Sequence, residues 1–265
     1  LNGTSNFILS NMEEGMEFEP TLKLAQEKGY AEPDPSFDIE GTDAAHKIGI
    51  LSSLAFGSSL PPKDFYIEGI NGIHKDDFKY AYEMGYTIKH LAIAKSTNNS
   101  IDLRAHPSLV KLDSYLANLK GVRNGIEVET DLLGTLHIAG SGAGQEATAS
   151  GVISDLIYLS DSKIREVNNI NETIELIDFI DLDFQYYFYI EASDVSGVMA
   201  SISTIFADKD VSIESISQKE NLNDDLVPII IITDPFKEKD YQELVDNLLD
   251  LDSVNKIRSI RIEPQ

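Results

Sequence analysis

The sequence contains no cysteine, no long apolar run and few basic residues. Without cysteine, a disulfide framework and thiolate metal sites are excluded, and the composition fits a reducing compartment such as the cytoplasm. No apolar run approaches the roughly 20 residues that a membrane helix requires. The 21 Lys and Arg stand against 45 Asp and Glu, a net charge of −24, whereas phosphate binding needs clustered basic residues. We therefore expect a cytoplasmic protein that binds neither nucleic acid nor a membrane.

At 265 residues, with 42% hydrophobic and 25% charged residues, the chain can form two ordinary globular domains. It begins with Leu1 rather than methionine and enters an apolar segment at Phe7 almost at once. We therefore expect it to be part of a larger protein.

Helical patterns come first along the chain, and strand patterns follow. The expected cap of the first helix is Thr4 or Ser5. The predicted elements are helices at residues 4–14, 20–28, 43–56 and 148–159, and strands at 86–94, 100–105 and 124–130, with a hairpin near 97–100. The apolar stripe of the third helix is expected at Ala44, Ile48, Leu51 and Ala55. This order predicts an α+β domain over residues 1–178, with helices and a mixed, mostly antiparallel sheet.

A second pattern of alternating strands and helices begins near residue 183. Strands are predicted at 184–191, 211–217, 226–233 and 254–262, and helices at 197–208 and 239–251. The order βαββαβ predicts a ferredoxin-like domain over residues 183–265, in which one helical layer covers one sheet.

Residues 29–47 hold five carboxylates ahead of a single lysine. They do not match a calcium loop, because a count from Asp34 puts Ile39 and Ala45 where glycine and glutamate are needed. Two interpretations stay open from the residues alone: a solvated acidic loop with prolines at its turns, or a pocket for a cationic ligand.

Lys47 favours the pocket. It lies four residues after Asp43, so the two side chains share a face of the predicted helix. A lysine next to a carboxylate can donate or accept a proton. Glu32, Asp34 and Asp38 can accept hydrogen bonds from an ammonium group such as that of an amino acid.

Three motifs in order carry a family resemblance. They are Asn-Gly-Thr-Ser-Asn-Phe-Ile-Leu at residues 2–9, Gly-Tyr-Ala-Glu-Pro-Asp-Pro followed by Asp38, Gly41, Asp43 and Lys47, and Gly-Ser-Gly-Ala-Gly at 140–144 with Ala-Thr-Ala-Ser at 147–150. Together they resemble homoserine dehydrogenase over residues 1–160. That family reduces aspartate semialdehyde to homoserine with NADH or NADPH, in the route to threonine and methionine.

The resemblance assigns roles to individual residues. It implies that Lys47 is the catalytic proton donor in the reduction and the acceptor in reverse. It implies that Glu32 and Asp43 bind the substrate's amino group, with Asp38 as an outer helper and Thr4 at the floor of the site.

The resemblance also implies a cofactor, NADP or NAD, with contacts at Gly3, Gly29 and Gly144. Family members hold the dinucleotide in an N-terminal domain with a G-x-G-x-x-G loop. The cluster at 140–144 is not that loop, because Gln145 stands where its last glycine is needed. We therefore expect no turnover from this chain alone. The histidines show no ligand spacing, so we expect no metal.

The second domain resembles an ACT domain, a regulatory amino-acid-binding module, through Asp194, Gly197 and the helix after them. Free N–H groups at this strand-to-helix turn can hold a carboxylate, and a simple helix start is the alternative. Ser196 replaces the proline that is usual in the family. If a ligand binds, the resemblance implies threonine as a feedback inhibitor.

The leading hypothesis is a fragment of a homoserine dehydrogenase that acts on homoserine and aspartate semialdehyde. The fragment contains the catalytic domain and an ACT domain and lacks most of the nucleotide-binding domain. The rival is an amino-acid-sensing ACT protein without catalysis. A dehydrogenase of another aldehyde amino acid would differ only in substrate. An exposed mixed sheet indicates a homodimer or homotetramer.

Overall fold

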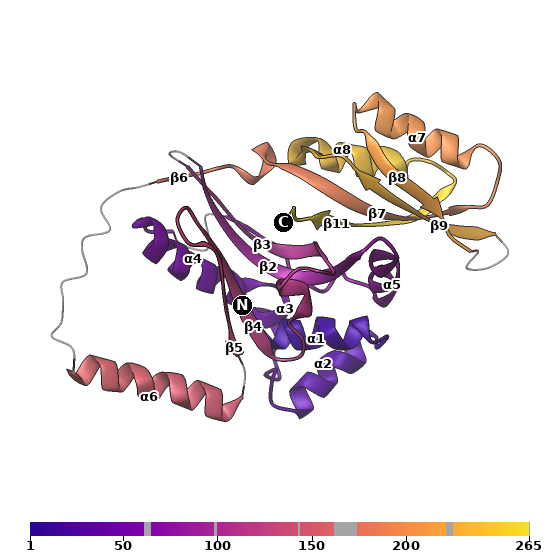
Figure 1. Cartoon of the computed structure of the whole chain (residues 1–265). Coiled ribbons are helices and arrows are strands. Elements are labelled where there is room, and N and C mark those ends of the chain that lie inside the picture. Colours follow the sequence, from indigo (N-terminus) through magenta and orange to yellow (C-terminus); the bar gives the residue numbers. More distant parts are fainter. Residues whose placement is uncertain (61–64, 98–99, 143, 162–173, 221–224, 265) are drawn as a thin grey trace. The chain divides into compact units, whose positions relative to one another are not determined.

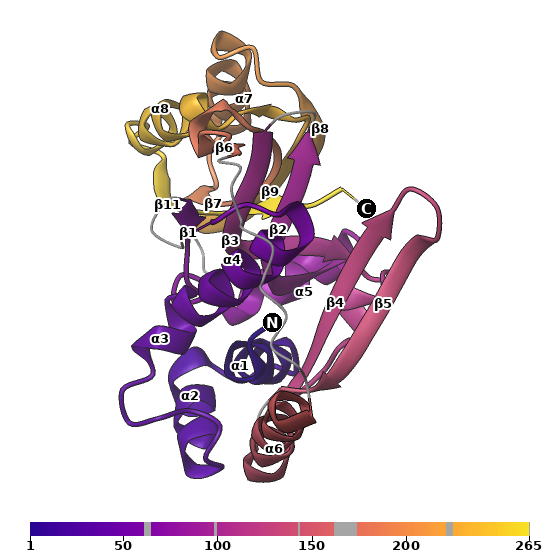
Figure 2. The same cartoon turned by 90° about the vertical axis from the view of Figure 1, so that its left-hand side faces the viewer.

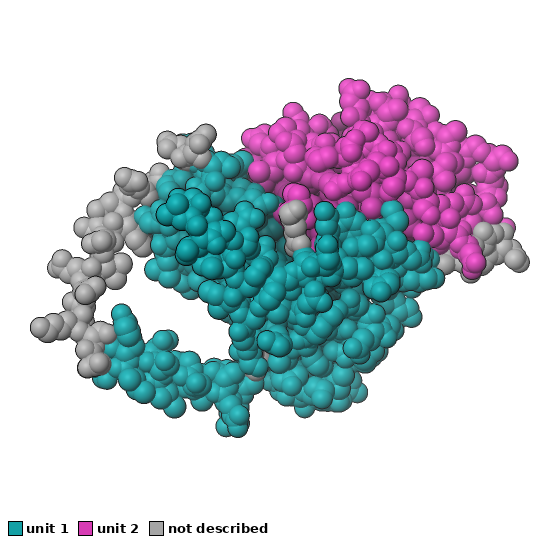
Figure 3. Space-filling model, in the orientation of Figure 1, with its two compact units in different colours: residues 1–107, 111–177 teal, residues 108–110, 178–265 magenta. Residues whose placement is uncertain are grey.

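A computed structural model describes residues 1–60, 65–97, 100–142, 144–161, 174–220 and 225–264. The chain divides into two compact units, residues 1–107 with 111–177 and residues 108–110 with 178–265 (Figure 3). Helices and a mixed sheet make up the first unit, and a helical layer on an antiparallel sheet makes up the second. The predicted α+β class is therefore confirmed.

The described helices of the first unit are α1 (Gly3–Glu13), α2 (Phe18–Glu27), α3 (Ser36–Ile39), α4 (Thr42–Phe56), α5 (Lys75–Glu83) and α6 (Gln145–Asp161), with a 3-10 turn at Leu116–Asn118. Of these, α1, α2, α4 and α6 lie close to the predicted helices, whereas α3 and α5 were not predicted. α1 packs on α2 and on the strand β2 (Tyr86–Thr97), as Figure 1 shows. The buried side of α5 consists of Asp77, Phe78, Tyr80 and Ala81.

The predicted cap of α1 was wrong. The cap is Asn2, which has extended backbone angles (φ −126°, ψ 118°) and accepts a hydrogen bond from the backbone N–H of Ser5. Thr4 and Ser5 already lie inside the helix, and their hydroxyl groups donate to carbonyl groups elsewhere.

The strands of the first unit form a sheet around β3 (Ser100–Lys111). β1 (Tyr66–Ile67) and β6 (Glu175–Leu176) run parallel to β3, and β2 also pairs with it. The parallel pairs make this sheet mixed. The hairpin expected between β2 and β3 contains residues 98–99, which lie outside the described residues.

A separate antiparallel ribbon follows in the first unit. It consists of β4 (Arg123–Thr130) and β5 (Gly134–Ser141), with Ile126 opposite Ile138 (Figure 2). β4 was predicted and β5 was not. Several apolar side chains of this ribbon and of the following helix α6 are exposed, and they are Leu132, Leu133, Ile138, Val152, Ile153, Leu156, Ile157 and Leu159.

The core of the first unit fixes the orientation of α4. Ile48 of this helix packs with Leu60 and with Ile101 and Leu103 of β3. The predicted stripe is only partly buried: Ala44 and Ile48 are buried, Leu51 is half-buried and Ala55 is exposed. Burial of the Ile48 side holds α4 against the sheet while Lys47 keeps access to solvent.

The second unit has the predicted βαββαβ order. Its elements are β7 (Asp183–Ser193), α7 (Val198–Asp208), β8 (Ile213–Gln218), β9 (Leu226–Thr233), α8 (Glu238–Leu249) and β11 (Val254–Ile262), with the short strand β10 (Phe236–Lys237) and a 3-10 turn at Phe179–Asp181. The strand order β11-β7-β9-β8 is antiparallel throughout. Ile202 and Phe206 of α7 and Leu244 of α8 pack on one face of this sheet. Across the described ranges, no helix has the length and apolar character needed to cross a bilayer.

Candidate active site

The acidic stretch folds into a loop and two helices that follow one another closely. Asp34 Oδ1 accepts a hydrogen bond from the backbone N–H of Ser36 at 3.1 Å, which sets the turn into α3. Hydrogen bonding from the Ser36 side chain, and then from this backbone N–H, lowers the pKa of Asp34. Gly41 joins α3 to α4 with a positive φ of 85°. The backbone N–H of Ile70 donates to Ile39 O at 2.8 Å and so ties the end of α3 to the segment after β1.

Asn2 lies at the centre of the polar network that the loop forms with α1. Its Nδ2 donates to Asp38 Oδ1 and to Asp43 Oδ2, each at 2.7 Å. Its Oδ1 accepts from the backbone N–H of Ser5 at 2.7 Å. The structure therefore brings together two of the predicted carboxylates, and it joins them through a residue that had no predicted role.

Lys47 completes this network. Its Nζ donates to Asp43 Oδ2 at 2.6 Å and to the backbone carbonyl oxygen of Leu1 at 3.1 Å. The Lys47 side chain is 43% exposed and that of Asp43 is 18% exposed, so the ion pair lies at the surface end of a partly buried cluster. The spacing of four residues along α4 gives this pairing, as predicted.

The remaining substrate residues of the prediction lie on different parts of the loop. Thr4 is buried, and its Oγ1 donates to Tyr30 O at 2.6 Å, so only its lone pairs remain for a ligand. The Glu32 side chain is exposed, and no hydrogen bond joins it to Asp38, Asp43 or Lys47 in the part of the chain that the structure describes.

The three predicted cofactor glycines are far apart in the sequence. Gly3 is buried in the first turn of α1, directly after Asn2. Gly29 ends α2 and is exposed, as is Gly144, which directly precedes α6. Gly144 thus follows the strand β5 of an antiparallel ribbon, whereas a dinucleotide loop follows a strand of a parallel sheet.

A half-buried histidine lies against the turn at Gly41. A Cβ atom on Gly41 would lie 3.0 Å from His90 Nε2 and 3.1 Å from Glu68 O. His90 Nε2 lies 2.9 Å from the same carbonyl oxygen, so it carries the proton and donates. Burial lowers the pKa of His90 to about 4 although this hydrogen bond opposes the shift, and the ring is therefore neutral at pH 7.

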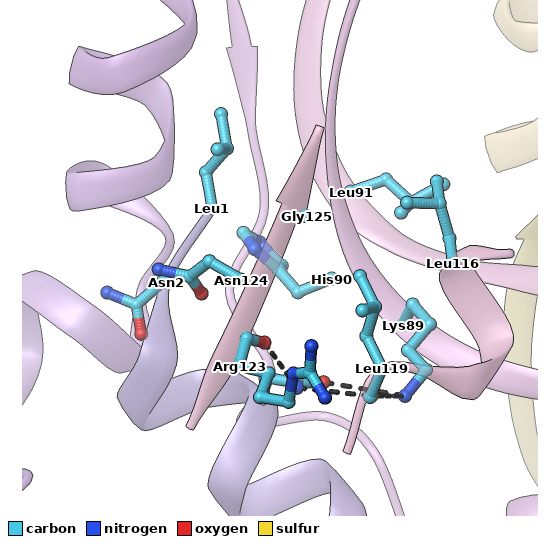
Figure 4. A pocket seen from close by; sticks show the side chains of 11 residues that line it. Leu1, Asn2, Lys89, His90, Leu91, Leu116, Leu119, Arg123, Asn124 and Gly125 are labelled. Atoms are coloured by element: carbon cyan, nitrogen blue, oxygen red, sulfur yellow. Dashed lines mark hydrogen bonds between the residues drawn. The ribbon is translucent and has the colours of Figure 1, made fainter. Parts of the chain in front are cut away.

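A small cavity of about 40 Å³ adjoins the network (Figure 4). Asn2, Lys89, His90 and Asn124 are among the side chains that line it. Lys89 is buried, and its Nζ donates to Leu119 O at 2.7 Å. Burial, with Lys120 nearby, lowers the pKa of Lys89 to about 8. The cavity has room for water.

The predicted regulatory residues lie in the second unit, before α7. Gly197 directly precedes the helix, and Gln218 Nε2 donates to Asp194 Oδ1 at 3.4 Å. Asp194 also donates its backbone N–H to Asp225 O. These contacts hold the turn, and the first N–H of α7, at Val198, donates to Val195 O at 3.4 Å.

Three residues of this region escaped prediction: Asn2, His90 and Lys89. Asn2 was noted only as part of a motif, and its position beside two good helix caps gave no reason to prefer it. His90 and Lys89 lie in a strand with no spacing that indicates a site. Their burial depends on α1 and on the loop after β1, which sequence periodicity does not place.

The arrangement can bind a cation and move a proton. Asp38 and Asp43 each use one oxygen within the network, and their second oxygens have no partner among the described residues. An exposed ammonium group adjoins them at Lys47. This combination suits a small substrate with an ammonium group at one end and a carbonyl or hydroxyl group at the other.

Comparison with known proteins gives the same family in each case. A homoserine dehydrogenase family model matches residues 1–157, and an ACT domain model matches residues 186–252. The chain is 41% identical to a homoserine dehydrogenase of Pseudomonas aeruginosa, with 99% of this chain and 64% of the relative covered. It is 39% identical to that of Neisseria gonorrhoeae, with 99% and 63% covered.

Solved structures agree with these matches. A homoserine dehydrogenase from Thiobacillus denitrificans has a TM-score of 0.87 and 39% identity, with 99% of this chain and 62% of that chain covered. The enzyme from S. aureus has a TM-score of 0.71 and 28% identity, with 100% and 64% covered. The chain thus spans less than two thirds of the length of the curated relatives it matches.

Proposed function

This chain belongs to the homoserine dehydrogenase family, and we propose that it supplies the substrate-binding and proton-transfer part of an NAD(P)-dependent homoserine dehydrogenase. The reaction interconverts L-aspartate 4-semialdehyde and L-homoserine in the cytoplasm, on the route to threonine, methionine and isoleucine. The observation that carries the proposal is the network in which Asn2 joins Asp38 and Asp43 beside the exposed ammonium of Lys47.

Lys47 is the proton carrier of the proposed reaction. The nicotinamide cofactor, when bound, supplies the hydride that reduces the aldehyde carbon. The aldehyde oxygen then becomes an alkoxide, and Lys47 Nζ stabilises its charge and donates a proton to it. In the reverse direction the neutral amine accepts the hydroxyl proton of homoserine. Asp43 holds Nζ in place through the 2.6 Å contact.

The carboxylates bind the other end of the substrate. The free oxygens of Asp38 and Asp43 accept hydrogen bonds from the α-ammonium group, and Glu32 lies on the same loop with an exposed side chain. Several carboxylates around one ammonium give a strong preference for an amino acid over a simple aldehyde.

The residues of this chain can contact part of the dinucleotide cofactor but cannot hold the whole of it. Gly3 and Gly144 precede or begin helices, where backbone N–H groups without helical partners can donate to a ligand. A dinucleotide loop of the required spacing is absent from this sequence. We therefore propose that the relatives' additional length holds most of the cofactor, and that the 265-residue chain alone has no turnover.

Replacement of Lys47 tests the proposal. In the enzyme with its nucleotide-binding domain, Lys47→Ala should lower kcat by about a hundredfold, the usual loss when a general acid–base group is removed. Lys23→Ala is a matched control, because Lys23 is an exposed lysine on α2. An unchanged kcat in Lys47→Ala would reject the role of this lysine. In the isolated chain, homoserine should protect Lys47 from acylation and leave Lys23 unprotected.

The ACT match favours one further function, amino-acid sensing through the second unit. We propose threonine as the effector, bound near Asp194 and Gly197. Calorimetry on the isolated chain separates this function from catalysis: threonine binding without protection of Lys47 by homoserine indicates a sensor alone, and protection indicates the catalytic site.

A homodimer or homotetramer is part of the same proposal. The exposed apolar side chains of β5 and α6, such as Ile138 and Leu156, favour burial against another protein surface. Light scattering during size-exclusion chromatography measures the mass directly, and a monomer at 50 micromolar, roughly the range in which specific dimers of ordinary affinity persist, would reject this part.

A further inference from the structure

The inference concerns Asn2 and rests on the proposed function. The residue is 6% exposed, and its side chain donates its two amide hydrogens to two different carboxylates. Asp38 Oδ1 and Asp43 Oδ2 are therefore separated by no more than the summed lengths of these two hydrogen bonds. Two ionised carboxylates at such a distance repel each other unless donors lie between them.

The orientation of the Asn2 amide follows from its partners. The backbone N–H of Ser5 can only donate, so Oδ1 must face it at 2.7 Å. The NH₂ group then faces Asp38 and Asp43. The opposite orientation would set the amide oxygen against two carboxylates and the NH₂ group against an N–H donor.

Asn2 also determines which oxygens stay available. It occupies Oδ1 of Asp38 and Oδ2 of Asp43, and Lys47 shares the latter. The second oxygen of each carboxylate has no hydrogen-bond partner within the ranges that the structure describes. Both aspartates are thus held by one oxygen, with the other left for a ligand.

We propose that Asn2 is a positioning residue of the active site. It holds the carboxylates of Asp38 and Asp43 side by side, turns their second oxygens toward the substrate ammonium and fixes the carboxylate that holds Lys47. Its action on the substrate is indirect, through these three side chains, and it is separate from its role as the cap of α1.

Two substitutions separate positioning from capping. Serine and aspartate are both good helix caps, so Asn2→Ser and Asn2→Asp preserve the cap but remove the NH₂ group. Asn2→Ala removes both. Asn118→Asp is the control for the change in charge. Asn118 is exposed, and its Nδ2 donates to Ser114 O and to no other group among the described residues.

The experiment is a set of steady-state kinetics for homoserine oxidation from pH 6 to 9, in the enzyme with its nucleotide-binding domain. Asn2→Ser should lower kcat/KM by about tenfold to a hundredfold, with a raised KM, because charged hydrogen bonds to two carboxylates are lost. Its unfolding midpoint by circular dichroism should remain near that of the wild type. Asn118→Asp should leave the kinetics unchanged.

Asn2→Asp should give a distinct pH profile. A third carboxylate raises the pKa of the group, and the proton taken up can donate one hydrogen bond in place of the amide. The activity of Asn2→Asp relative to the wild type should therefore recover as the pH falls from 8 to 6. If this variant does not fold, Asn2→Ser decides the question.

The outcomes show whether the positioning role of Asn2 fails alone or together with the proposed function. The positioning role would be overturned if Asn2→Ser had the same kcat/KM as the wild type. It would also be overturned if the loss of activity in the variants followed their unfolding midpoints and did not depend on pH. If Lys47→Ala loses activity while the Asn2 variants retain it, only the inference about Asn2 fails. If Lys47→Ala is fully active, the proposed function fails, and the inference fails with it.

Discussion

Substitution of Gly41 by alanine is expected to destabilise the first unit well beyond an ordinary surface change. Gly41 has a φ of 85°, and the left-handed conformation costs an alanine about 1–2 kcal/mol. Its added Cβ would also lie 3.0 Å from His90 Nε2 and 3.1 Å from Glu68 O. Both neighbours are held by their mutual hydrogen bond, so the crowding should add about 1–3 kcal/mol. The total is about 2–5 kcal/mol.

Gly85 offers a matched control. Its φ is 86°, and a Cβ there would meet no atom within 4 Å, so Gly85→Ala should show the backbone cost alone. Both glycines belong to the first unit, and urea unfolding followed by circular dichroism compares them directly. Equal losses of stability for Gly41→Ala and Gly85→Ala would refute the close-approach reasoning. Because Gly41 caps the helix that carries Asp43 and Lys47, Gly41→Ala should also lower activity.

Three further predictions concern ionisable groups that are buried or half-buried. The pKa of Lys89 is lowered from 10.5 to about 8, so the unfolded chain binds more protons in this window; stability should rise between pH 8 and 10.5 in the wild type relative to Lys89→Met. The pKa of His90 is lowered from 6.5 to about 4, so stability should fall as the pH drops through this range, and less steeply in His90→Gln. In the second unit, Glu238 and Arg261 form a buried ion pair at 2.6 Å. Glu238→Leu should lower the free energy of unfolding by about 3–5 kcal/mol, and adding Arg261→Met should recover part of that loss. Urea titrations test all three predictions.

The sequence predicted those elements whose local signals were strong. The helices α1, α2 and α4 combine apolar spacing with caps or a terminal glycine, and the second unit alternates apolar strands with amphipathic helices. The helix α5 was missed because its first turn is stabilised by an unusual capping box, in which the His74 side chain accepts from a backbone N–H. The strand β5 was missed because its side chains are exposed, so that burial does not produce an alternating pattern.

The candidate site was predicted where its geometry is local. Asp43 and Lys47 meet because they are one helical turn apart. Asn2 rather than Thr4 or Ser5 is the cap because its side chain also contacts Asp38 and Asp43. These aspartates lie 36 and 41 positions farther along the chain, so no local sequence pattern indicates the contacts. The position of His90 beneath Gly41 depends in the same way on the packing of β2 against the loop after β1.

The long-range hydrogen bonds of Asn2 have a consequence for the order of folding. They close loops of 36 and 41 residues, and the entropy cost of such closure must be met by other contacts before the side chain can bridge two aspartates. Docking of α1 against α2 and β2 supplies those contacts. The polar cluster should therefore form late in folding, after the helical layer has assembled. Its backbone amides should exchange hydrogen at the same rate as those of the layer, because both open as one cooperative unit.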